Sequence, residues 1–290
     1  LGLWLWDRYA VGMRASTRQV ARREHVAAAQ AIGTSTPRSL WAEILPNVMN
    51  NLIVVATLEM AHAILLEAAL SSVADQAITV TCAGRTDAGV HARRFALNFH
   101  YDGRIPVQRI PLALNARLPM DVRALAAQQV PDDFHARYAA HAKTYHYRLR
   151  CSAVDDPFDY ETCHRVNGPL DLAAMQAAAA HFVGRHDFLA LCASGSSAAA
   201  HGDTVRTITA CTVQQDGELY TLSVTADGYL YNMVRILTGT VLQAGLGKMN
   251  PAAVPALLQS RNRGQAGPTL PARGLFLWDV QYPDLERPND

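Results

Sequence analysis

Apolar and polar residues alternate over several short stretches of the chain, and this period of two predicts half-buried strands. In Lys143–Arg150, for example, Tyr145, Tyr147 and Leu149 share one face. The same alternation, or a β-rich composition, predicts further strands at Ala77–Ala83, Arg94–Tyr101, Val205–Val213, Tyr220–Ala226 and Leu275–Tyr282.

A helical period lies between these strands. Residues Asn232–Ala244 place their apolar side chains on one face, which predicts an amphipathic helix. Asp171 is a good N-cap for a second helix, which we expect Gly184 to end. A third helix is predicted from about residue 58 to residue 73. Strands interspersed with helices predict an α+β fold.

The length of 290 residues corresponds to about two domains. We expect a boundary near Asp155-Asp156-Pro157, with α+β halves at 65–155 and 156–290. Residues 1–64 form a separate segment of different texture, in which arginines among alanines precede a strongly apolar run. Its uncharged stretch between Glu43 and Glu59 holds 15 residues. A bilayer helix needs about 20, so we expect no stable membrane association.

The net charge of +1 conceals an uneven distribution. Residues 85–150 hold eleven basic and five acidic side chains, whereas residues 151–290 hold nine and fourteen. A basic middle segment favours an anionic partner such as nucleic acid. The five cysteines show no C-x-x-C spacing, so neither a disulfide framework nor a zinc site is indicated. Reduced thiols and the lack of a visible signal peptide predict a cytoplasmic protein.

The most informative segment is Cys82–Ala92, which reads CAGRTDAGVHA. Gly84 and Gly89 bracket a turn that carries Asp87, and Arg85 lies two residues before it. A carboxylate beside a cation stays ionised and can act as a nucleophile or as a base. Taken alone, however, an Asp in a glycine-bounded turn is more often structural.

The whole string resembles the active-site motif of TruA-type tRNA pseudouridine synthases, in which this Asp is catalytic. Further segments resemble that family in its order, over about residues 65–285: Asn115–Pro119, Asp132–Arg137, Lys143–Tyr147, Gly184–Phe188, Val205–Ile208, Asn232–Arg235 and Gly267–Leu275. The resemblance implies two ferredoxin-like halves whose antiparallel sheets face a central basic cleft. It also implies a homodimer that isomerises uridines at tRNA positions 38 to 40, in the anticodon stem-loop, without a metal or cofactor.

The resemblance also assigns roles to residues. Asp87 would attack the sugar or take a proton, and these alternatives stay open. Tyr145 would stack on the uracil, and Arg235 would pair with Asp87 and orient it. The side chains expected to bind RNA are all basic: Arg85, Arg93, Arg94, Arg117, Arg137 and Lys143. His91 and His135 would either contact RNA or support their turns. The isomerisation needs one carboxylate near the sugar, whereas a glycoside hydrolase uses two. Asp87 is the one acid in its motif.

The front of the chain departs from this family, whose usual opening strand and loop are absent. In its place, Glu24–Gly33 followed by Ile44–Asn47 resembles the cytoplasmic coupling loop of dipeptide-type ABC-transporter permeases. Leu52–Thr57 has the composition to replace the opening strand. Because it lacks that loop's residues, we expect weak or absent catalysis and poor docking of residues 1–45. The alternatives to a pseudouridine synthase are a permease fragment and a non-catalytic RNA-binding module.

Overall fold

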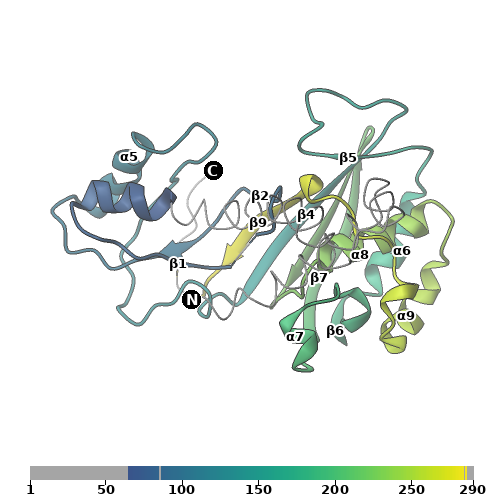
Figure 1. The fold of residues 1–290 in the computed structure, drawn as a ribbon. Helices are drawn as coiled ribbons and strands as arrows, with labels where there is room; N and C mark the ends of the chain where they lie inside the picture. Colours follow the sequence, from purple (N-terminus) through teal and green to yellow (C-terminus); the bar gives the residue numbers. More distant parts are fainter. Residues whose placement is uncertain (1–64, 85, 284, 286–290) are drawn as a thin grey trace, which may run out of the picture. The chain divides into compact units, whose positions relative to one another are not determined.

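The computed structural model describes residues 65–84, 86–283 and 285 of the chain (Figure 1). These residues fall into two units, and each is described by itself. Residues 194–203 belong to one unit and contain the short helix α7 (Ser197–Ala200). The remaining described residues form the other. The predictions for residues 1–64, including the strand at Leu52–Thr57, lie outside the described residues. Within the described residues, no helix is both long and apolar enough to cross a membrane.

A seven-stranded mixed sheet organises the larger unit (Figure 1). Its strand order is β2-β9-β4-β8-β7-β6, and β5 pairs with β4 off this path. The strands are β2 (His91–Ala92), β4 (Ala142–Cys151), β5 (His164–Val166), β6 (Gly184–Asp187), β7 (Val205–Asp216), β8 (Leu219–Ala226) and β9 (Leu275–Gln281). The pairs β2–β9 and β4–β5 are parallel, and the others are antiparallel. The predicted strands in residues 143–150, 205–213, 220–226 and 275–282 are confirmed.

Alternating burial explains why these strands form. Along β8, Tyr220, Leu222, Val224 and Ala226 are buried while the residues between them are partly exposed. Helices cover the apolar face: α6 packs against α8 and β7, and α8 also contacts β4. The α+β class is therefore confirmed. The strand β4 lies between β9 and β8 within one sheet, and the division of the chain at residue 155 stays a prediction.

Three helices accompany this sheet: α6 (Leu172–Ala180), α8 (Met233–Gly245) and α9 (Val254–Ser260). The prediction for Asp171 is confirmed, because its carboxylate accepts the Ala174 N–H at 3.0 Å. The expected end of this helix at Gly184 is wrong. The helix ends at Ala180, where tight turns take over, such as the one in which the Phe182 N–H reaches the Ala179 carbonyl. Gly184, at φ 118°, instead opens β6.

The remainder of the larger unit packs on a second core. Its elements are a helix over residues 65–74, the short helix α5 (Ile110–Asn115), and the two-stranded antiparallel sheet of β1 (Thr81–Cys82) and β3 (Leu97–Asn98). The buried residues of this core are Ala69, Leu70, Ile78, Ile110, Leu114 and Leu118. Short 3-10 turns complete the unit: η2 (Val107–Arg109), η3 (Leu189–Leu191), η4 (Pro251–Ala253), η5 (Arg263–Gln265) and η6 (Ala272–Gly274).

The strands predicted at Ala77–Ala83 and Arg94–Tyr101 shrink to two residues each, β1 and β3. Just before β1, the edge of the chain that faces away from β3 is bonded to the 65–74 helix. The Ile78 N–H donates to Ser71 Oγ at 2.9 Å, and the Val80 N–H donates to Glu67 Oε1 at 3.1 Å. Side chains of the 65–74 helix thus satisfy groups that would otherwise pair with a strand.

This contact predicts a stability effect at Ser71. Ser71→Ala leaves the N–H of buried Ile78 without its acceptor, so we expect the free energy of unfolding to fall by about 1 kcal/mol. Urea unfolding followed by circular dichroism measures it. The matched control is Ser72→Ala, because the exposed Ser72 hydroxyl only accepts a bond from Arg117. Equal urea midpoints for the two variants would contradict the proposed role of the helix side chains.

Candidate active site

Asp87 lies on a loop that leads from β1 to β2. The loop closes on itself, because the Val90 N–H donates to the Asp87 carbonyl at 3.0 Å. Gly89 has φ 80°, a left-handed conformation that glycine adopts without steric cost. After the turn, β2 pairs with β9, with His91 opposite Phe276. The loop that carries Asp87 is therefore joined to the large sheet through β2, four residues after Asp87. Arg85, predicted to bind RNA, lies outside the described residues.

Arg235 faces Asp87 from the first turn of α8. Its Nη1 lies 3.5 Å from Asp87 Oδ2, and the side chains are 18% and 26% exposed respectively. The same Nη1 donates to Asn232 Oδ1 at 2.6 Å, and Nε donates to the Leu270 carbonyl at 2.6 Å. A cation in the first turn of a helix is opposed by the helix dipole. The three oxygens around this guanidinium compensate for that and fix its direction.

Two glycines let the Leu270 carbonyl reach Arg235. A Cβ on Gly239 of α8 would lie 2.0 Å from the Pro268 carbonyl oxygen, and a Cβ on Gly267 would lie 2.3 Å from the Gly239 carbonyl carbon. Only glycine allows the helix and this segment to approach so closely. The Leu270 N–H in turn donates to the Arg235 carbonyl at 3.4 Å. Backbone packing therefore places the acceptor that orients the arginine.

Tyr145 of β4 completes the group. Its ring meets the Tyr229 ring edge-on, with centroids 4.9 Å apart and planes at 83°. Burial, and secondarily the negative charge of Asp87, raise the pKa of Tyr145 to about 12. The phenol is therefore neutral at physiological pH, beside the carboxylate. Tyr147, two residues along, is fully buried and donates to the Pro271 carbonyl at 2.7 Å. The structure thus brings together all three residues predicted to be catalytic, Asp87, Tyr145 and Arg235.

Tyr229, Asn232 and the Leu270 carbonyl are parts of this site that the sequence argument missed. Tyr229 is held at both ends, since its hydroxyl lies 2.7 Å from the Lys143 carbonyl oxygen while its ring contacts Tyr145. The sequence pattern included Asn232 in the amphipathic helix without giving its side chain a role, whereas the structure places it just before the helix, at the N-cap position. Its φ of 58° is a conformation that Asn tolerates better than most residues. A backbone carbonyl has no side-chain signature, so Leu270 offered none.

The basic residues predicted to bind RNA occupy different surroundings. Arg93 is exposed and lies over the Trp278 ring, with Cζ 4.7 Å from its centroid. Arg94 pairs with the buried Asp279 at 3.8 Å. Arg137 lies over Tyr138, with Cζ 5.7 Å from the ring centroid. Lys143 donates through Nζ to the Ala83 carbonyl at 2.7 Å. Burial, and then the charge of Arg137, lower the pKa of Lys143.

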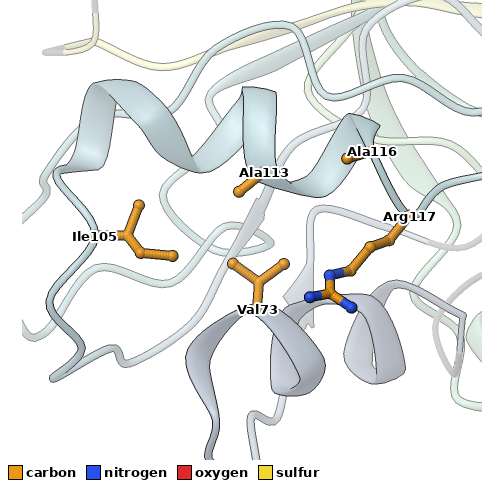
Figure 2. A pocket seen from close by; sticks show the side chains of 5 residues that line it. All are labelled: Val73, Ile105, Ala113, Ala116 and Arg117. Atoms are coloured by element: carbon orange, nitrogen blue, oxygen red, sulfur yellow. The ribbon is translucent and has the colours of Figure 1, made fainter.

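Arg117 lies apart from this group, in the helical layer of the second core. Its Nη1 donates to Ser72 Oγ at 2.8 Å. Figure 2 shows its guanidinium reaching the 65–74 helix beside Val73, along a groove lined also by Ile105, Ala113 and Ala116. Its predicted role in RNA binding stays a prediction.

The two histidines within motifs have structural contacts. His91 Nε2 lies 2.8 Å from the Glu161 carbonyl oxygen, and its ring stacks on Phe276 with centroids 4.7 Å apart. His135 Nδ1 accepts the Arg137 N–H at 3.2 Å. These contacts favour support of the turns, the second of the alternatives left open by the sequence.

The proximity of Asp87 to Tyr145 can be tested by measuring the pKa of Tyr145. Asp87→Asn removes a negative charge that disfavours the phenolate, so we expect the pKa of Tyr145 to fall below about 12 while remaining above that of a free tyrosine because of burial. NMR titration of ¹³C-labelled tyrosine, assigned with Tyr145→Phe, measures it. Asp121→Asn, at an exposed acid, is the control. An unchanged pKa in Asp87→Asn would place Asp87 too far from Tyr145 for the proposed site.

Known proteins resemble both parts of the chain. Residues 60–139 and 178–283 match a family model described as tRNA pseudouridine synthase, and residues 1–84 match one described as a binding-protein-dependent transport system inner membrane component. The tRNA pseudouridine synthase A of Moorella thermoacetica is 46% identical over 215 residues, covering 74% of this chain and 86% of that protein. Those of Halalkalibacterium halodurans and Acetivibrio thermocellus are 44% and 39% identical, covering 69% and 75% of this chain and 74% and 88% of their own lengths. The chain therefore belongs to the tRNA pseudouridine synthase family.

Proposed function

We propose that the protein isomerises uridine to pseudouridine in tRNA, with Asp87 as the catalytic carboxylate. The observation that carries the proposal is that Asp87 lies 3.5 Å from the guanidinium of Arg235 and near enough to Tyr145 for its charge to raise the pKa of that phenol. A carboxylate that is paired with a cation and fixed on a short loop is suited to act beside a sugar. The names of the relatives support the same substrate.

The reaction breaks the C1′–N1 bond of uridine, turns the uracil and joins C1′ to C5. The proton displaced from C5 goes to a base, and N1 regains a proton, so the product is an isomer of the substrate. An ionised Asp87 can serve as the nucleophile at C1′ or as the proton acceptor. The Tyr145 ring would stack on the extruded uracil. Arg235 would hold the carboxylate and aim it at the sugar.

The substrate proposal is completed by contacts to the RNA backbone. Guanidinium groups bind phosphate well because their planar forks match its oxygens. We propose the anticodon stem-loop as the tRNA segment, a homodimer as the active assembly and the cytoplasm as the location. These finer points rest on the family resemblance of residues 65–285. Arg93 and Arg137 are the phosphate contacts proposed first, because each guanidinium lies over an aromatic ring.

The deciding experiment compares the wild-type chain with Asp87→Asn. We expect wild type to release tritium from [5-³H]uridine-labelled tRNA, and Asp87→Asn to release none, because the amide can neither attack C1′ nor take a proton. The affinity for tRNA should stay within a few-fold, since binding rests on phosphate contacts. Asp102→Asn, at an exposed acid, should keep full turnover. Binding without tritium release by wild type would identify an RNA-binding module instead.

Arg93 and Arg94 should respond differently to substitution. Arg93→Gln removes an exposed cation, so we expect the slope of log affinity for tRNA against log salt to decrease by about 0.7–0.9. Arg94→Gln removes an ion pair with the buried Asp279, so we expect it to lower the free energy of unfolding by about 1 kcal/mol. Filter binding across a salt series and urea unfolding measure the two effects. If Arg94→Gln changed the salt slope and Arg93→Gln did not, Arg94 would be the phosphate contact and Arg93 would not.

A further inference from the structure

Lys143 lies where the Asp87 loop leaves β1. Its Nζ donates to the Ala83 carbonyl at 2.7 Å, and the Ala83 N–H donates to the Ala96 carbonyl at 2.9 Å. Ala83 is fully buried, so both of its backbone polar groups are bonded away from water. The ammonium also lies next to Gly84, because a Cβ built on Gly84 would lie 3.6 Å from the same Nζ. It therefore bonds to Ala83 and lies beside Gly84, the two residues that lead into the turn.

The same lysine is tied to the strand of Tyr145. Residues two apart on a strand share a face, so Lys143 and Tyr145 point the same way from β4. The irregularity in the β4–β9 pairing does not disturb this, since the unpaired residue is Trp278 of β9. A single side chain thus joins the entry of the Asp87 loop to the strand that carries the stacking tyrosine.

The end of the Asp87 loop is held by β9, the strand that pairs with β4. The Arg93 N–H donates to the Leu277 carbonyl at 2.9 Å, and Leu277 is the β9 partner of Tyr145. The exit is thus fixed by the β2–β9 ladder, whereas Lys143 reaches the entry with a side chain. Removing that side chain would release one end of the loop while leaving the other in place.

Partial burial of the Lys143 ammonium costs desolvation free energy, which bonds to the ammonium must offset. Within the described residues Lys143 forms no ion pair with an acid, and the charge of Arg137 acts on it unfavourably. Its ammonium donates to the Ala83 carbonyl. A charge-assisted bond to a backbone carbonyl is stronger than a neutral one and offsets part of the desolvation cost.

We propose that Lys143 is a positioning residue: its ammonium fixes the entry of the Asp87 loop relative to Tyr145, and it does not serve chiefly as a phosphate contact. The inference rests on the proposed function for its catalytic consequence. Loss of the bond lets Asp87 shift relative to the sugar, and shifts of about 1 Å can cost on the order of 100-fold in rate. Phosphate contacts elsewhere are unaffected, so tRNA binding is preserved.

The experiment compares Lys143→Met, Lys143→Gln and Lys143→Arg. Met removes the donor and keeps the stem, Gln keeps a neutral donor, and Arg keeps a charged one. At saturating enzyme, we expect the single-turnover rate of pseudouridine formation to fall roughly 10- to 100-fold in Lys143→Met. The decrease should be smaller in Lys143→Gln and smallest in Lys143→Arg. The Kd for tRNA should stay within about threefold, with an unchanged salt slope. Lys248→Met is the matched control, because it removes the other lysine of the chain, which is exposed after α8, and we expect it to leave the saturated rate, the Kd and the salt slope unchanged.

Two results would overturn the proposal. One is a Lys143→Met enzyme with a normal saturated rate and a salt slope lowered by about 0.7–0.9, which is the signature of a phosphate contact. The other is unaltered hydrogen exchange of the amides at residues 84–90 in Lys143→Met. We expect faster exchange there in Met than in Arg, with the amides of β8 unchanged. Because exchange needs no turnover, it tests the positioning even if wild type proves inactive, which would refute the proposed function alone.

Discussion

The ion pair between Asp87 and Arg235 is the contact on which the rest of the site depends. Its two partners come from separate elements, a loop between short strands and the first turn of α8. Neither element fixes the pair alone. The arginine is aimed by the Asn232 side chain and by the Leu270 carbonyl, and the latter can approach because Gly239 and Gly267 carry no Cβ. The packing of α8 against the segment around Gly267 therefore helps to set the direction of the guanidinium.

The neighbouring tyrosines constrain the charge of the site. Tyr145 is neutral because burial and the Asp87 carboxylate both disfavour its phenolate. A neutral ring offers a flat apolar surface to a base and adds no second negative charge beside the carboxylate. The edge-to-face contact with Tyr229 fixes the orientation of the Tyr145 ring. The site therefore combines one anion with a neutral stacking surface, which suits a substrate whose own backbone is polyanionic.

The sequence predicted the long elements of the fold and the pairing of Asp87 with Arg235, but not the backbone contacts that position these side chains. Strands β4, β7, β8 and β9 were predictable because one face of each is buried, which imposes alternation. The short strands β1 and β3 were overpredicted, and the N–H groups of Ile78 and Val80 just before β1 donate to Ser71 and Glu67 side chains instead of to a strand. The Ala83 and Leu270 carbonyls are backbone acceptors, and no side-chain pattern could reveal that Lys143 and Arg235 reach them.

The hydrogen bonds that Ser71 and Glu67 accept from Ile78 and Val80 also bear on how the Asp87 loop begins. The family resemblance implies an additional strand beside residues 77–83, which would need backbone donors on that edge. Ile78 and Val80 are two residues apart, as are successive donors along one strand edge, and both N–H groups are already bonded to the 65–74 helix. The Ala83 N–H, of opposite parity, faces β3 instead. A strand on that edge and these two helix contacts would compete for the same donors. The geometry leading into Asp87 therefore depends on which of them is made.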